Sequence, residues 1–236
     1  MRSRSASDEP VLVGGLTPLT TIDYPGELAA VIFLQGCPWR CGYCQNSELL
    51  PRKNQNSIPW HEIITLLEKR KGLLDAVVFS GGEPTIQSGL DIAIQQVKSM
   101  GFKIGLHTAG IYPDRLQKLL PLIDWVGIDI KSALADYQSI TGVKGSGERA
   151  WKSARVLIES GVPYEFRTTV HPEMLSEEQI STLVNDLTVL GAEHYVIQQC
   201  VTTFCLDESR RVTTIPKLAL ALVNQYVDNF TSFIVR

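Results

Sequence analysis

The sequence lacks several features that would place it in other classes of protein. No apolar run approaches the roughly 18 residues that a membrane-spanning helix needs. Residues 1–10 carry arginines and serines, but no apolar segment follows them, so we do not expect a signal peptide. The net charge of −3 gives no reason to expect nucleic acid or an anionic membrane as a partner. Without repeats, low-complexity stretches or linkers, the 236 residues are expected to form one globular cytoplasmic domain.

Cysteine is scarce, with five residues in the chain, but three of the five stand close together. Cys37, Cys41 and Cys44 have the spacing C-x-x-x-C-x-x-C and follow the apolar run Leu28 to Leu34, which predicts a buried strand. The thiols are therefore expected on a loop at the carboxyl end of a strand, where α/β folds place their chemistry. Clustered thiols without signs of export fit the reducing cytoplasm better than a disulfide framework.

The absence of a second ligand pair limits what this loop can bind. Zinc sites usually take four ligands, and no second C-x-x-C or pair of histidines follows at usable spacing. An iron–sulfur cubane also normally takes four thiolates, so three cysteines would leave one iron open to another ligand. Three thiols within eight residues are improbable as a chance grouping. The open iron is the functional hypothesis, and a non-catalytic iron–sulfur or zinc-binding protein is the alternative of a different class.

The rest of the chain alternates between predicted strands and predicted helices. Strands are predicted at residues 28–34, 76–79, 103–106, 125–130, 164–170, 195–198 and 232–235. Helices are predicted at residues 60–71, 88–100, 115–120, 149–160, 176–190 and 217–226. This alternation predicts an α/β fold with a parallel sheet in a single domain, residues 16–236, preceded by a flexible tail at residues 1–15.

Three motifs give the chain a family resemblance. The cysteine loop has an aromatic residue, Tyr43, before its third cysteine, and the motif S-G-G-E-P at residues 80–84 follows the next predicted strand. Together these two motifs resemble those of the radical S-adenosylmethionine (SAM) enzymes. Upstream, T-T-I-D-Y-P-G at residues 20–26 resembles the T-x-D-x-P-G segment of glycyl-radical-enzyme activases. More narrowly, the chain resembles the anaerobic ribonucleoside-triphosphate reductase activating proteins.

The resemblance implies a fold and a reaction. The fold is a partial (β/α)6 barrel of the radical SAM type. The enzyme is a radical SAM oxidoreductase that holds a [4Fe–4S] cluster on Cys37, Cys41 and Cys44 and binds SAM at the open iron. Reductive cleavage of SAM gives methionine and a 5′-deoxyadenosyl radical, which generates a glycyl radical on a partner enzyme, an anaerobic ribonucleotide reductase.

An alternative within the same superfamily is an enzyme acting on a small molecule, such as a carboxylate-bearing purine precursor. The T-x-D-x-P-G segment and the lack of an extra substrate-binding domain favour the activase. No cysteine lies between Cys44 and Ser80, where some activases carry a ferredoxin-like insert with further cysteines. One cluster is therefore expected, with its electron supplied by an external donor such as a flavodoxin or ferredoxin.

The resemblance also implies which residues contact SAM. Glycines let the backbone approach a ligand closely, and in the family the glycine turn hydrogen-bonds the amino group of the methionine part. The glutamate of that turn is expected to serve the turn's own hydrogen bonding rather than catalysis. The predicted cofactor-binding residues are Tyr43, Gly81, Gly82, Glu83, Thr108, Asp129, Lys131 and Arg167.

Three of these residues also have a purely structural interpretation. Strand alternation puts Asp129 and Lys131 on the same side, and their segment is similar to the cofactor-contacting D-[LI]-K of the activases. The structural alternative is an ion pair at a strand end. Arg167 lies within a predicted strand and would be costly to bury unpaired. It is expected either to face the cofactor or substrate, or to be a salt-bridged strand arginine.

The chain departs from the activases of pyruvate formate-lyase at two places. His107 stands where those relatives have an aspartate that helps hold a monovalent cation, which leaves open whether a cation binds here. His107 is expected to be a hydrogen-bonded histidine at a strand end. Near the end of the sixth strand the relatives have a cofactor-binding histidine, and this chain has Q-Q-C at residues 198–200. Cys200 and Cys205 are expected to be plain buried thiols, with second-site ligands or a radical-handling pair as alternatives.

Overall fold

The computed structural model describes residues 9–52, 56–212 and 225–236. The chain divides into two compact units. The first unit comprises residues 1–38, 48–108 and 118–126, and the second comprises residues 39–47, 109–117 and 127–236. The strands follow one another in chain order through the sheet, from β1 to β8. Among the described helices, none is long and apolar enough to cross a membrane.

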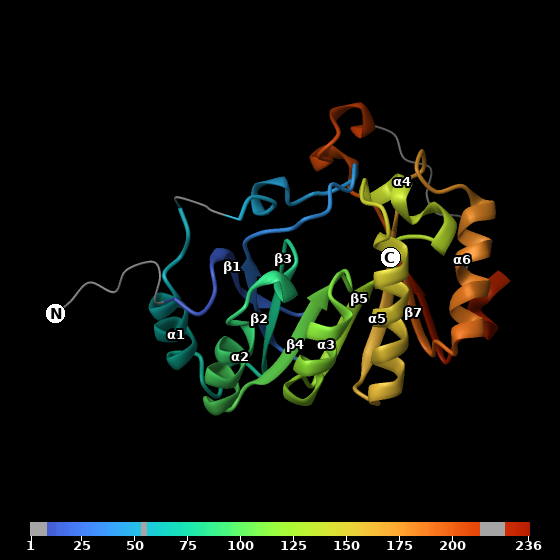
Figure 1. Ribbon diagram of the computed structural model, residues 1–236. Helices are drawn as coiled ribbons and strands as arrows, with labels where there is room; N and C mark the ends of the chain where they lie inside the picture. The colour runs from blue at the N-terminus through green and yellow to red at the C-terminus, as the bar shows by residue number, and fades with distance from the viewer. Residues whose placement is uncertain (1–8, 53–55, 213–224) are drawn as a thin grey trace. The chain divides into compact units, whose positions relative to one another are not determined.

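Four strands open the sheet in the first unit (Figure 1). They are β1 (Val13–Thr20), β2 (Ala29–Leu34), β3 (Ala76–Gly81) and β4 (Lys103–Thr108). β1 is antiparallel to β2, from which only a turn separates it, whereas β2, β3 and β4 are parallel. The last pair in the β2–β3 register is Leu34 with Gly81. The cysteine loop and the G-G-E-P turn therefore leave the sheet at the same edge.

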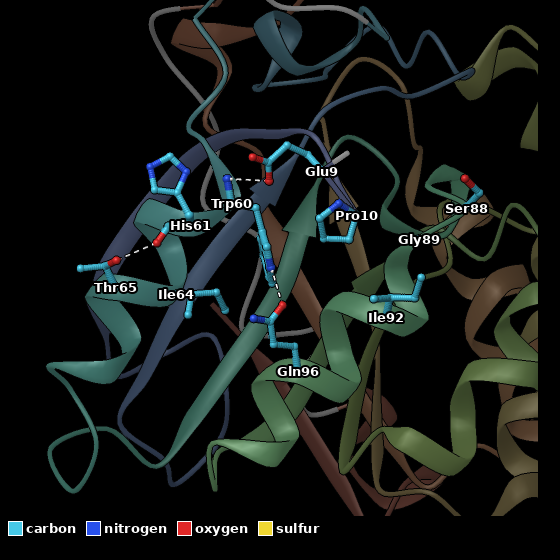
Figure 2. Close-up of a pocket in the computed structure, with 10 residues that line it drawn as sticks. All are labelled: Glu9, Pro10, Trp60, His61, Ile64, Thr65, Ser88, Gly89, Ile92 and Gln96. Atoms are coloured by element: carbon cyan, nitrogen blue, oxygen red, sulfur yellow. Dashed lines mark hydrogen bonds between the residues drawn. The ribbon is translucent and has the colours of Figure 1, made fainter. Parts of the chain in front are cut away.

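The two helices of the first unit are α1 (Trp60–Glu68) and α2 (Leu90–Ser99). They lie side by side, and the indole N–H of Trp60 donates to the side-chain oxygen of Gln96 at 2.8 Å (Figures 1 and 2). Each helix buries an apolar stripe, as amphipathic helices on a sheet do.

One apolar cluster of the first unit joins its strands to the β1–β2 turn. Its buried members are Tyr24, Ala29, Val31, Ala76, Val78 and Trp125. The ring of Tyr24 lies 5.3 Å from that of Trp125. A Cβ on Gly105 of β4 would come within 3.0 Å of the Tyr24 ring, so the glycine makes room for it. The T-x-D-x-P-G turn thus folds over the strands and is anchored there by its tyrosine.

The second unit contains the later strands and helices of the chain. β5 (Trp125–Asp129) runs from the first unit into the second, and α3 (Pro113–Leu119) precedes it in the chain. The remaining elements are α4 (Tyr137–Thr141), α5 (Ser146–Ser160), β6 (Tyr164–Val170), α6 (Glu177–Leu190), β7 (His194–Gln199) and β8 (Ser232–Val235). β6, β7 and β8 are parallel, and α5 and α6 run alongside the strands of this unit (Figure 1).

The predicted alternation of strands and helices is confirmed, with differences at three places. The hairpin strand β1 was not predicted, because glycine, threonine and proline weaken its apolar alternation. The short helix α4 lies in a stretch predicted to be a connection. The predicted helix at residues 217–226 falls mostly outside the described residues. The domain was predicted to begin at residue 16, whereas β1 begins at Val13 and the preceding Val11 is buried.

Candidate functional site

The cysteine loop is held by backbone hydrogen bonds at both of its ends. In the first unit, the N–H of Cys37 donates to the carbonyl of Leu50 at 3.1 Å. In the second unit, the N–H of Cys44 donates to the carbonyl of Cys41 at 2.9 Å, which closes a turn around the last two cysteines. None of these three cysteines is in a disulfide. Within the described ranges, no three side chains of His, Cys, Asp or Glu gather in an arrangement that would hold a metal ion.

The glycine turn after β3 packs against the beginning of the cysteine loop. Gly81 has φ +116°, a conformation that favours glycine, and a Cβ there would collide with the backbone of Leu34. A Cβ on Gly82 would lie 2.5 Å from the carbonyl oxygen of Gly36. The N–H groups of Gly82 and Glu83 donate to the carbonyls of Leu34 and Gly36, each at 2.9 Å. Both glycines are thus required by the close approach of two backbones, directly before Cys37.

Glu83 serves the turn's own hydrogen bonding, as predicted. Its side chain is fully buried and accepts from the N–H and the hydroxyl of Thr85, at 3.1 and 2.5 Å. It also accepts from the hydroxyl of Thr108 at 2.7 Å. Two residues predicted to bind the cofactor, Glu83 and Thr108, therefore bond to each other and hold the ends of β3 and β4 together.

A set of charged side chains lies at the end of β5 in the second unit. The carboxylate of Asp129 is 3.5 Å from the ammonium of Lys131 and 3.3 Å from Nε of Arg167. Arg167 also donates from Nη2 to the carbonyl of Gly127 at 3.2 Å. The predicted ion pair is present, and Arg167 is salt-bridged. A Cβ on Gly127 would lie 2.7 Å from the guanidinium carbon, so this glycine lets the arginine cross the strand.

Tyr43 extends the charged set with a buried aromatic ring. The ammonium of Lys131 lies 5.4 Å from the centre of that ring, a cation–π contact. The hydroxyl of Tyr43 is buried and has no hydrogen-bond partner among the described residues. The backbone N–H of Lys131 donates to the hydroxyl of Tyr137, which donates in turn to the carbonyl of Asp129. An unpartnered buried hydroxyl beside a lysine marks a place where a polar ligand group would be accommodated.

Burial governs the titration of the groups around Tyr43. It raises the pKa of the Cys41 thiol, and the nearby charge of Lys131 opposes that rise. Burial also raises the pKa of the Tyr43 and Tyr137 hydroxyls well above that of a free tyrosine. Both tyrosines are therefore neutral at physiological pH. Lys131 is the neighbouring group that stabilises a thiolate at Cys41.

His107 is a hydrogen-bonded histidine at the end of β4, as predicted. Its Nε2 lies 2.8 Å from the carbonyl oxygen of Asp23. A carbonyl only accepts, so the ring donates from Nε2. The imidazole also makes an edge contact with the ring of Trp125, with centres 5.6 Å apart. The Asp23 carboxylate accepts from the hydroxyl of Thr20, so the T-x-D-x-P-G turn and His107 form one local network.

Cys200 and Cys205 are both buried thiols, as predicted, and their sulfur atoms lie 3.9 Å apart. The side-chain amide of Gln45 donates to the sulfur of Cys200 at 3.8 Å. Burial raises the pKa of the Cys200 thiol to about 12. The contact between the two thiols could not be derived from the sequence, because the four residues between them carry no periodicity.

A cavity of about 1000 Å³ opens in the first unit between α1, the start of α2 and the segment Glu9–Pro10 (Figure 2). Its wall combines the apolar side chains of Ile64 and Ile92 with polar groups. The carboxylate of Glu9 accepts from the N–H of Trp60 at 3.1 Å and so caps α1. No residue predicted to bind the cluster or SAM lines this cavity.

Comparisons with known proteins bear on this geometry. The model of the radical SAM superfamily matches residues 31–186. The chain is 33% identical over 230 residues to the putative glycyl-radical enzyme activating enzyme MJ1227 of Methanocaldococcus jannaschii, which covers 92% of this chain and 94% of that protein. It is 31% identical over 172 residues to the pyruvate formate-lyase-activating enzyme of Clostridium pasteurianum, covering 70% and 71% of the two chains.

Solved structures have the same fold. Streptococcus suis SuiB bound to the precursor peptide SuiA matches with a TM-score of 0.67 at 20% identity, over 87% of this chain. This chain spans about half the length of SuiB, 48%. A domain of the pyruvate-formate lyase-activating enzyme from Bacteroides vulgatus matches with a TM-score of 0.55 at 18% identity, over 67% of this chain and 98% of that domain. These likenesses confirm the predicted α/β fold, a partial barrel of the radical SAM type.

The fold and the cysteine motif define a radical SAM enzyme. Within that superfamily, the chain belongs to the glycyl-radical enzyme activating enzymes. The cofactors of the superfamily are a [4Fe–4S] cluster and SAM, and SuiB has also been solved with SAM bound. The donor set of this chain suits them, since three cysteines outside any disulfide stand in the required spacing beside a buried, unpartnered tyrosine hydroxyl.

Proposed function

We propose that this protein activates an anaerobic ribonucleoside-triphosphate reductase by generating a glycyl radical on it. The observation that carries the proposal is the relationship to MJ1227, named a putative glycyl-radical enzyme activating enzyme, over nearly the whole of both chains. The T-x-D-x-P-G turn, whose Tyr24 packs in the core of the first unit, also supports a glycyl-radical activase. The choice of reductase rests on the resemblance of the motifs.

In this proposal, Cys37, Cys41 and Cys44 hold the cluster as thiolates. Bound together, the cluster and SAM supply the electron transfer that yields methionine and a 5′-deoxyadenosyl radical. The protein excludes water from this chemistry and fixes the geometry. The positive charge of Lys131 favours the thiolate of Cys41. An external flavodoxin or ferredoxin provides the electron, because no further cysteine motif is present in the sequence.

The charged set at the end of β5 would bind the methionine part of SAM. Lys131 and Arg167 place two cationic groups beside the carboxylate of Asp129. A second carboxylate, that of methionine, complements such a set. The hydroxyl of Tyr43 is a further polar group without a partner in the described structure.

The glycine turn would contribute backbone groups to the same cofactor. By resemblance to the family, a backbone group of the turn at Gly81 and Gly82 would hydrogen-bond the amino group of the methionine part. Glu83 and Thr108 act indirectly, since their mutual hydrogen bond holds the turn in shape. They are positioning residues rather than groups that touch the cofactor.

The test is transfer of the radical to a candidate partner. The reconstituted protein is incubated anaerobically with SAM, reduced flavodoxin and anaerobic ribonucleotide reductase, and electron paramagnetic resonance is recorded. We expect a glycyl-radical signal on the reductase that requires both SAM and the activase. The matched control replaces the reductase with a variant whose radical-bearing glycine is alanine, which must remain silent.

Pyruvate formate-lyase is the second candidate partner, because a pyruvate formate-lyase-activating enzyme is 31% identical over 172 residues. The same incubation with pyruvate formate-lyase separates the two. A signal on the lyase and none on the reductase would move the proposal to that partner. Silence on both, with 5′-deoxyadenosine released upon addition of a small carboxylate substrate, would replace the activase by a small-molecule enzyme.

A further inference from the structure

Two buried thiols close a short loop at the carboxyl end of β7, and the proposed reaction uses neither. Cys200 and Cys205 are 1% and 0% exposed, and their sulfur atoms are 3.9 Å apart. A disulfide bond is about 2.05 Å long, so closure requires an approach of about 2 Å. We call residues 200–205 the thiol loop.

The thiol loop presents apolar side chains to solvent and is fixed at its base. Val201 and Phe204 are 52% and 66% exposed. The hydroxyl of Thr202 donates to the carbonyl of Val212 at 2.6 Å, and Nε of Arg211 donates to the carbonyl of Cys205 at 3.0 Å. The two sulfurs are therefore held in contact by the following segment.

The residues after the thiol loop are bonded directly to the cysteine motif of the same unit. The N–H of Leu206 donates to the carbonyl of Cys44 at 2.9 Å, and the N–H of Asp207 donates to the carbonyl of Gly42 at 3.0 Å. From the other side, the amide of Gln45 reaches the sulfur of Cys200. A movement of Cys205 toward Cys200 would displace Leu206 and Asp207, and hydrogen bonds of this length weaken within a few tenths of an ångström.

We propose that Cys200 and Cys205 form a redox-active dithiol whose oxidation to an intramolecular disulfide loosens the Gly42–Cys44 part of the cluster-binding loop. The oxidant class is a low-molecular-weight disulfide of the glutathione type. The two cysteines are thus a modification site. Their oxidation couples the redox state of the cell to the order of the loop that carries Cys44. The proposal rests on the proposed function only in treating Cys41 and Cys44 as cluster ligands.

The chemistry is thiol–disulfide exchange and balances without any other reactant. One protein sulfur attacks the small disulfide as a thiolate, which forms a mixed disulfide and releases one small thiol. The second protein sulfur attacks the mixed disulfide, forms the S–S bond between Cys200 and Cys205 and releases the second small thiol. The protein loses two electrons, the small disulfide gains them, and the two protein protons end on the released thiols. Because both sulfurs are buried, exchange requires a transient opening of the thiol loop.

The first experiment maps the thiols of the full chain with its cluster reconstituted anaerobically. The protein is equilibrated in buffers with graded ratios of reduced to oxidised glutathione, trapped by alkylation and analysed by peptide mass spectrometry. We expect Cys200 and Cys205 to lose their reactivity together, in one peptide lighter by two hydrogen atoms and free of glutathione. Thiols that stay alkylatable across the series, or that carry glutathione separately, would overturn the proposal.

The second experiment measures coupling by amide hydrogen exchange at Leu206 and Asp207. We expect the oxidised protein to exchange about tenfold faster at these amides than the reduced protein, because the bonds to Cys44 and Gly42 are lost. The matched control is Cys205→Ser, which must show no response to the glutathione ratio. Equal exchange in both redox states of the wild type would disprove the coupling. Neither measurement needs SAM cleavage or a partner enzyme, so a failure here is distinct from a failure of the proposed function.

Discussion

Two carboxylates, Glu83 in the first unit and Asp129 in the second, carry the same charge in opposite surroundings. Glu83 is fully buried, and its bonds go to hydroxyl and N–H groups of Thr85 and Thr108. The side chain of Asp129 is 34% exposed and faces two cations, Lys131 and Arg167. The first environment builds a hydrogen-bonded turn, whereas the second places a partly exposed carboxylate beside two buried cations. Environment, not residue type, assigns the roles.

The contrast extends to the groups around each carboxylate. Around Glu83 the glycine turn is locked by backbone contacts with Leu34 and Gly36, so little freedom is left for it to adapt. Around Asp129 a buried tyrosine hydroxyl, that of Tyr43, has no partner in the described structure. Buried polar groups are rarely left this way unless something binds them. The comparison teaches that the surroundings of Glu83 are shaped in advance, whereas those of Asp129 leave a polar group for a ligand to complete.

The largest effect is expected at the three cysteines of the proposed cluster loop. Cys37→Ala, Cys41→Ala and Cys44→Ala should each abolish the cluster, because two thiolates do not hold a cubane. Iron and sulfide analysis after anaerobic reconstitution measures this. Cys205→Ala is the matched control and should retain full iron content. Equal iron in Cys44→Ala and wild type would exclude Cys44 as a cluster ligand.

Asp129→Asn should keep the cluster but lose SAM cleavage by about a hundredfold, since misplacement of the cofactor by about an ångström has effects of that size. The measurement is 5′-deoxyadenosine formation with dithionite. Asp114→Asn is the matched control: Asp114 pairs with Lys152 at 2.9 Å, but its side chain is 80% exposed, so its loss should change little. Wild-type turnover in Asp129→Asn would make Asp129 a structural residue like Glu83.

Motifs bounded by strands could be placed from the sequence because hydrophobic runs fix where strands end. The run before Cys37 and the run before Gly81 became β2 and β3, paired in register up to Leu34 and Gly81. Alternation along the next strands correctly put Asp129 beside Lys131. The helix predicted at residues 176–190 is also present, and it begins with a capping box at Ser176. These features depend on neighbours in the chain, which the sequence displays directly.

Features that depend on distant neighbours could not be predicted in this way. Gly127 is needed because the guanidinium of Arg167 crosses it, a contact across 40 residues of chain. The contact between Cys200 and Cys205 arises from an irregular loop, and the bond from Leu206 to Cys44 joins positions 162 residues apart. The bond between Glu83 and Thr108 likewise links the ends of two strands. Such contacts follow from tertiary packing, which has no periodic signature.

Glu83→Gln should destabilise the first unit and thereby sharpen the comparison. All three donors of Thr85 and Thr108 reach one carboxylate oxygen of Glu83, and the neutral oxygen of an amide accepts more weakly than a charged one, so we expect a loss of about 1–3 kcal/mol in the free energy of unfolding. Urea unfolding measures it. Thr108→Val removes only one of the three bonds and should cost about 1 kcal/mol. If Asp129→Asn lost more stability than Glu83→Gln, Asp129 rather than Glu83 would be the carboxylate with the structural role.

The smallest effect at neutral pH is expected for Tyr24→Phe, which probes the anchor of the T-x-D-x-P-G turn. Burial, with smaller contributions from Asp124 and Glu27, raises the pKa of Tyr24 from 10.0 to about 12. A raised folded-state pKa means that the unfolded chain releases its proton first as pH rises. The stability contribution is therefore full below pH 10 and is lost between about pH 10 and pH 12. Tyr24→Phe should unfold like wild type at pH 7, within about 0.5 kcal/mol, but should lose less stability between pH 10 and pH 11.

Tyr195→Phe is the contrasting variant. The hydroxyl of Tyr195 donates to Thr168 at 2.8 Å, so its removal should already cost about 0.5–1.5 kcal/mol of stability at pH 7. If Tyr24→Phe followed the wild-type curve through pH 11, Tyr24 would titrate as an exposed tyrosine, and the turn would not be anchored in the core.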